Sequence, residues 1–125
     1  MVETKYDLVG DLGQKDKTLA PEEILEQQAL LLEEKTEGRI KVKIKVNNYQ
    51  DEDSVVVNFF LIIPKMNDFI YGFLFIYRSF YTKYPAKILW NDEWYEAENE
   101  SEFVAKIANI FADKKTRKMI ADYNN

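Results

Sequence analysis

The chain has 125 residues and a formal net charge of -5, and it contains no cysteine and no histidine. A chain of this length suits one domain with a substantial core, because it buries roughly two-thirds of its extended surface. The missing residue types exclude disulfide frameworks, thiolate nucleophiles, serine–histidine triads, and zinc sites built from cysteine or histidine. The acidic total charge disfavours general nucleic-acid binding, and it fits either solubility or a basic protein partner.

The sequence predicts no membrane segment. Its N-terminal stretch is polar and charged, and the longest uncharged runs in the middle of the chain are residues 54–64 and 69–77. A membrane helix needs about 20 apolar residues, so neither run is long enough. We therefore expect no membrane association and a cytoplasmic location, and the lack of cysteine agrees with a reducing compartment.

The first elements are a flexible lead over residues 1–18 and a helix over residues 21–36, with residues 19–125 forming a single domain. Pro21 suits the first helical position, and acidic residues follow it in the first turn. Gly38 lies just past the last turn, where a helix stop is expected. The apolar stripe at helical spacing consists of Ile24, Leu25, Gln28, Leu31 and Leu32.

Four to five strands are predicted next. Residues 39–46 alternate between basic and apolar side chains, which indicates a strand with one wet face. Residues 55–63 and 69–78 are apolar in both alternating sets, and shorter strands are predicted at 86–90 and 94–98. Since the connections between them are short, the strands are expected to pair as an antiparallel meander.

The chain ends in helices. Asn99 and Glu102 have the spacing of a capping pair, and Asp113 is placed to cap a further short helix. The order of elements predicts an α+β fold, in which an N-terminal helix and a C-terminal helix or helix pair pack on an antiparallel sheet. The buried stripe of the first C-terminal helix is expected to contain Phe103, Ile107, Ile110 and Phe111.

Two charged segments are candidates for binding. The basic row of the first strand could follow phosphates, but such a row also protects an exposed strand from aggregation, and we favour that interpretation. The acidic run over residues 91–102 contains aromatic residues, and aromatic anchors within a charged rim are typical of protein interfaces. The predicted partner-binding residues are Trp90, Asp92, Glu93, Trp94, Tyr95 and Glu96.

No catalytic, cofactor-binding or metal-binding residue is predicted. The acidic run lacks the ligand spacing of an EF-hand, and no glycine-rich phosphate loop is present. We therefore expect a protein-binding module that is not an enzyme, in the manner of an inhibitor, an immunity protein or an adaptor. One alternative is a carrier of small apolar ligands, with a pocket between sheet and helix lined by Phe59, Phe73, Phe75 and Tyr77. Another is a homodimeric structural subunit.

The stretch "FIYGFLFIYRSFYTKY", residues 69–84, raises a further question. Its period of two predicts a strand that is apolar on both faces, and the apolar stripes of the helices need one of these faces as their partner surface. The other face would leave a large apolar patch in water. We expect that patch to be covered by the N-terminal segment, by a helix or by another molecule.

Overall fold

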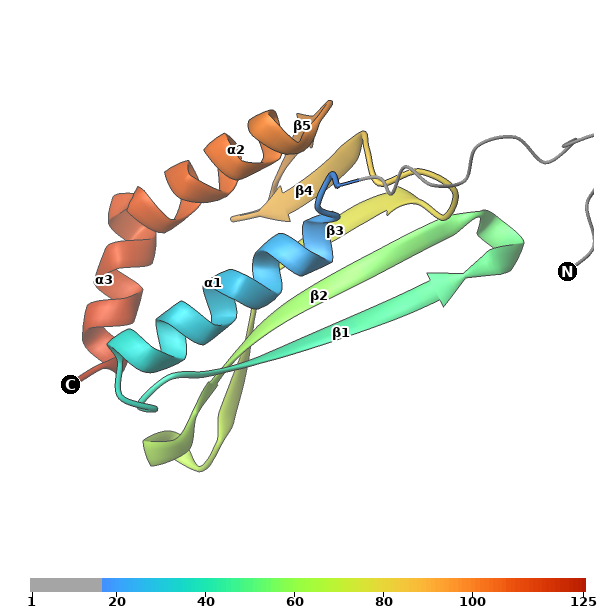
Figure 1. Cartoon of the computed structure of the whole chain (residues 1–125). Helices are drawn as coiled ribbons and strands as arrows, with labels where there is room; N and C mark the ends of the chain where they lie inside the picture. The colour runs from blue at the N-terminus through green and yellow to red at the C-terminus, as the bar shows by residue number, and fades with distance from the viewer. Residues whose placement is uncertain (1–16) are drawn as a thin grey trace, which may run out of the picture.

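In the computed structural model, which describes residues 17–125, one helix precedes a five-stranded sheet and two helices follow it (Figure 1). This arrangement confirms the predicted α+β fold class. The flexible lead predicted for residues 1–18 falls almost entirely outside the described residues. The elements are α1 (Pro21–Lys35), β1 (Lys41–Tyr49), the 3₁₀ turn η1 (Gln50–Glu52), β2 (Ser54–Ile63), the 3₁₀ turn η2 (Pro64–Met66), β3 (Phe69–Ser79), β4 (Ala86–Trp90), β5 (Glu93–Ala97), α2 (Glu100–Ala112) and α3 (Lys114–Tyr123).

Helix α1 begins where the sequence predicts. The backbone N–H of Ala20 donates to Oε1 of Glu23 at 3.2 Å, and the N–H of Glu23 donates back to the carbonyl of Ala20 at 3.1 Å. These bonds satisfy donors that a helix start would leave unpaired. Leu31 was predicted to lie in the buried stripe but is 44% exposed, because it sits at the edge of the helix arc that faces the sheet. None of the helices within residues 17–125 has the length and apolar character needed to traverse a bilayer.

The sheet is an antiparallel meander in the order β1-β2-β3-β4-β5. Asn91 and Asp92 form the two-residue turn between β4 and β5, with φ angles of 53° and 61°. Asn and Asp tolerate positive φ better than most residues, and such a turn matches the twist of a hairpin. It pairs Trp90 with Glu93 and Leu89 with Trp94, so the two tryptophans lie on opposite faces of the sheet.

A β-bulge interrupts the pairing of β2 with β3. Phe59 pairs with Leu74 while Phe60 pairs with Gly72, so Phe73 is an extra residue on β3. The strict alternation predicted for this strand is therefore wrong across the bulge. Phe73 turns into the core, and the residues before it change faces relative to those after it.

All three helices lie against the same face of the sheet (Figure 1). The residues of β2 that face the helices are almost fully buried, and the predicted α2 stripe packs against them, with Phe111 half-buried. Helices α2 and α3 are capped as predicted, since Asn99 Oδ1 accepts from the N–H of Glu102 at 2.9 Å and Asp113 Oδ1 accepts from the N–H of Lys115 at 2.8 Å. The β2 residues on this face are Val55, Val57, Phe59, Leu61 and Ile63.

Two polar contacts fix α1 relative to the sheet. The guanidinium of Arg78 on β3 donates from Nη2 to Oε1 of Glu22 at 2.6 Å and from Nε to Oε2 at 3.1 Å. At the other end of the helix, Thr36 is buried, and its Oγ1 donates to the carbonyl of Leu32 at 2.9 Å. The same Oγ1 accepts from the N–H of Ile40 at 3.2 Å, which ties the end of α1 to the start of β1.

Candidate functional site: the helix-free face of the sheet

The face of the sheet opposite the helices, here called the open face, is not covered by any element within residues 17–125. It is largely apolar at its centre. Ile70 is 57% exposed, Trp94 is 55% exposed and Tyr77 is 40% exposed, although all three lie within strands. The strand pairing assigns these residues to the open face: Lys41, Lys43, Lys45 and Asn47 on β1; Val56, Asn58, Phe60 and Ile62 on β2; Ile70, Gly72, Phe75 and Tyr77 on β3; Lys87 and Leu89 on β4; Trp94 and Glu96 on β5.

Aromatic side chains from three strands pack on one another across this face. The rings of Tyr77 and Trp94 lie 5.3 Å apart between centroids at an angle of 59°, and those of Phe60 and Phe75 lie 6.2 Å apart edge to face. A Cβ atom built on Gly72 would lie 2.9 Å from Cζ of Phe75, so the ring of Phe75 rests against the glycine backbone. These contacts hold the rings in place without removing them from solvent.

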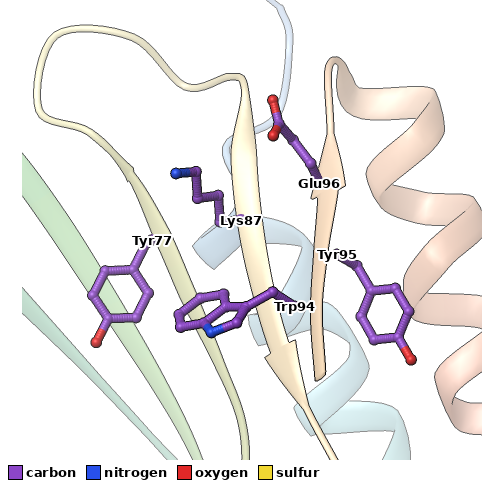
Figure 2. Close-up of a pocket in the computed structure, with 5 residues that line it drawn as sticks. All are labelled: Tyr77, Lys87, Trp94, Tyr95 and Glu96. Carbon is purple, nitrogen blue, oxygen red and sulfur yellow. The ribbon is translucent and has the colours of Figure 1, made fainter. Parts of the chain in front are cut away.

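A groove with a volume of about 510 Å³ runs beside Tyr77 and Trp94. Figure 2 shows the Trp94 ring reaching across β4 toward Tyr77, with Lys87 and Glu96 beside it. Tyr95 also lines the groove, but its ring points to the far side of β5, where Lys106 Nζ lies 3.5 Å from the ring centroid. The groove therefore combines a rigid aromatic floor with one basic and one acidic side chain.

The two edges of the open face carry opposite charges. Lys41, Lys43 and Lys45 are all exposed along β1. At the β5 edge, a hydrogen bond with Glu96, together with the charge of that carboxylate, raises the pKa of Glu98 above its usual value. Such a shift means that two acidic side chains lie close together at this edge. The open face thus carries three lysines along β1, and at its other edge Glu96 on β5 with Glu98 just past the end of that strand.

The structure separates the predicted partner-binding residues between the two faces of the sheet and the turn that joins β4 to β5. Trp94 and Glu96 lie on the open face, next to the groove. Trp90 lies on the helix side, half-buried, and lines a second cavity of about 250 Å³ beneath α3. Tyr95 also points to the helix side, where its hydroxyl donates to Oε2 of Glu93 at 2.7 Å, and this bond raises the pKa of Tyr95. Asp92 lies in the turn between the strands.

The four rings predicted to line a ligand pocket are not brought together. Phe59 and Phe73 lie in the core between sheet and helices, with ring centroids 6.0 Å apart, and both contact Phe111 of α2. Phe75 and Tyr77 lie on the open face instead. The bulge at Phe73 causes this division, because it changes which side chains of β3 share a face.

Several residues of the open face were not predicted as site residues. Lys87 lines the groove, and Phe60, Ile70 and Leu89 extend its apolar surroundings. The two-residue turn gives a sequence signal for part of this set, since it fixes Leu89 beside Trp94 and Lys87 beside Glu96. Gly72 within an otherwise bulky strand is a signal for the bulge.

Comparison with known proteins gives no match to a family model, to a curated protein or to a solved structure. Function is therefore inferred from the site alone.

Proposed function

We propose that the chain is a non-catalytic protein-binding module of the cytoplasm that docks a partner protein on its open face. An inhibitor, an immunity-type protein or an adaptor would act in this way. The observation that carries the proposal is the groove beside Tyr77 and Trp94, two large rings held against each other yet exposed. Tyr and Trp are the side chains most often found at energetic centres of protein interfaces.

The surroundings of the groove support the same function. Apolar side chains of β2, β3 and β4 continue the patch away from Tyr77, while charged residues lie along the edge strands. An apolar centre with a charged rim is the usual anatomy of a protein interface. Contiguous exposed apolar surface on a sheet is also an aggregation hazard when nothing binds it, which favours a partner over a free surface.

The carrier alternative has less support. A carrier needs a cavity that encloses most of its ligand. The rings proposed for that pocket lie on two faces of the sheet, and Phe59 and Phe73 fill space in the core.

The test compares three forms of the full chain: the parent, Trp94→Glu on the open face, and the control Leu30→Glu. Leu30 is 69% exposed on α1, so the control adds the same charge to an apolar surface residue away from the open face. Each tagged form is used to capture proteins from the cells that encode it, and bound proteins are quantified by mass spectrometry. Thermal unfolding by circular dichroism checks that each form is folded.

We expect at least one protein to be captured in equal amounts by the parent and by Leu30→Glu. Trp94→Glu should capture at least about tenfold less of that protein, since an interface anchor contributes roughly 2 kcal/mol or more to binding. An identical set of bound proteins for all three folded forms would contradict the proposal. The proposal would also be contradicted if the control Leu30→Glu lost the bound protein to the same extent as Trp94→Glu.

A further inference from the structure

We infer that the partner seated on the open face is a second copy of this chain, packed face to face about a two-fold axis that runs along the strands. This inference rests on the proposed function only in that the open face binds a protein. Its evidence is the placement of charge on the two edge strands and the order of residues across the sheet. A face that binds its own copy makes the chain a homodimeric subunit rather than an inhibitor, an immunity-type protein or an adaptor.

The strand register defines rows across the open face. One row runs Lys45, Asn58, Phe75, Leu89 and Trp94 from β1 to β5. Strand β3 is the middle strand of five, so a rotation about an axis along β3 exchanges the two ends of each row. In this row, Lys45 would then lie opposite Trp94 of the second copy, and Phe75 opposite Phe75 of the second copy.

The neighbouring row gives the same kind of match. It runs Asn47, Val56, Tyr77, Lys87 and Glu96. The rotation sets Asn47 opposite Glu96 of the second copy, and Tyr77 opposite Tyr77 of the second copy. Aromatic side chains therefore meet at the centre, while Lys45 meets Trp94 of the second copy, two residues along β5 from Glu96. The rows of Lys41 and Lys43 contain no residue of β4 or β5. A lysine over a tryptophan ring beside a carboxylate is favourable through both cation–π attraction and charge.

Two face-to-face dimers with a two-fold axis are possible, and the charges on the edge strands distinguish between them. Sheets that pack face to face keep their strands within about 30° of each other, so the two-fold axis lies either along the strands or across them. An axis across the strands would set β1 opposite β1 and β5 opposite β5. With that axis at Lys45, the middle of β1, Lys45 would face Lys45 of the second copy and each charged edge would face its own copy. Like charges brought together in an interface are unfavourable, which disfavours that packing.

The open face is also of suitable size. Strands about 4.8 Å apart that rise about 3.3 Å per residue give this sheet a flat area of roughly 600 Å². Side chains that protrude from the face add to the accessible area. A standard interface buries about 800 Å² on each partner. The range for specific interfaces starts at about 600 Å² per partner, so the open face is at the lower end of the size that a specific dimer uses.

The experiment uses sedimentation velocity on the full chain and on two charge-reversed variants. Lys43→Glu with Lys45→Glu makes the β1 edge acidic, and Glu96→Lys with Glu98→Lys makes the β5 edge basic. Lys114→Glu with Lys118→Glu, on the exposed side of α3, is the matched control for the first variant because it makes the same change in net charge.

We expect the parent and the control to sediment as dimers and each edge variant alone to dimerise at least about tenfold more weakly. An equimolar mixture of the two edge variants should form a heterodimer, since every reversed edge then faces one of opposite charge. A monomeric parent at about 100 µM would overturn the inference, as would edge variants that dimerise like the parent. So would edge variants that are monomeric alone and remain monomeric when mixed. A monomeric parent would leave the open face to a different protein, and the capture experiment with Trp94→Glu tests that function separately.

Discussion

The ion pair between Glu22 and Arg78 should contribute measurably to stability, and Glu22→Gln is the simplest test. The pair joins the first turn of α1 to β3 through two hydrogen bonds, from Nη2 at 2.6 Å and from Nε at 3.1 Å. The side chains are only 14% and 16% exposed. Glutamine keeps the shape of the side chain but leaves the guanidinium charge partly buried without a counter-charge.

The expected cost lies between two known limits. Removing one partner of a fully buried pair costs about 3–5 kcal/mol, whereas exposed pairs contribute at most about 1 kcal/mol. With roughly 15% of each side chain still in water, we expect the free energy of unfolding to fall by about 2 kcal/mol. For a domain of this size, that loss lowers the Tm by roughly 8 °C.

The assay is urea unfolding followed by circular dichroism for the parent, Glu22→Gln, Arg78→Met and the double variant. This cycle isolates the pair from other effects, such as the bond that Arg78 Nη1 donates to the carbonyl of Ser79. We expect a coupling energy of about 1–2 kcal/mol that changes little between low and high salt, because the pair is shielded from ions. Glu26→Gln, exposed on the same helix, is the control and should change stability by less than about 0.5 kcal/mol.

A coupling energy near zero would refute the reasoning, and so would a coupling that disappears in 1 M salt. Either result would mean that water and ions reach this pair as freely as they reach an exposed one.

Three further predictions concern other polar groups. Thr36→Val should lower the free energy of unfolding by about 1–3 kcal/mol in urea titrations, because the N–H of Ile40 loses its acceptor in a buried site, whereas Thr36→Ser should retain most of the stability. Glu98→Gln should raise the Tm at pH 7 but not below about pH 4: proximity to Glu96 raises the pKa of Glu98 in the folded state, so this site stabilises the fold below the unfolded pKa and that contribution is lost as pH rises. A destabilised variant at pH 7 would contradict this. Burial first, and then nearby carboxylates, raise the pKa of Tyr84 to about 12, so difference absorbance should show one tyrosine that ionises near pH 12 in the parent and is missing in Tyr84→Phe. Its stabilising contribution is complete below pH 10 and is lost as the pH rises through about 12.

Local sequence signals predicted most of the fold. Pro21 and the acids after it gave the start of α1, and Asn99 and Asp113 gave the starts of α2 and α3. These signals are reliable because capping depends on groups within three or four residues of one another. The paired strands were predicted as well, since alternation and short connections leave few topologies for a meander.

The candidate site was predicted only in part, because it depends on which face each side chain occupies. Trp94 and Glu96 were predicted within the partner-binding segment and Tyr77 within the ligand pocket, yet the structure places all three beside one groove. The two-residue turn at Asn91 separates Trp94 from Trp90, and the bulge at Phe73 separates Tyr77 and Phe75 from Phe73. A shift of one residue changes the face of every side chain beyond it, so composition cannot locate such a site.

The sequence by itself determined which residue types this chain lacks, the order of its elements and the excess of aromatic residues in its third strand. Each of these follows from residue types or from contacts between near neighbours. Only the tertiary structure decided that the helices share one face, that the bulge draws Phe73 into the core, and that Tyr77 and Trp94 meet on the open face. Those outcomes depend on pairing between distant strands, where packing against the whole core selects one register from several that local preferences allow.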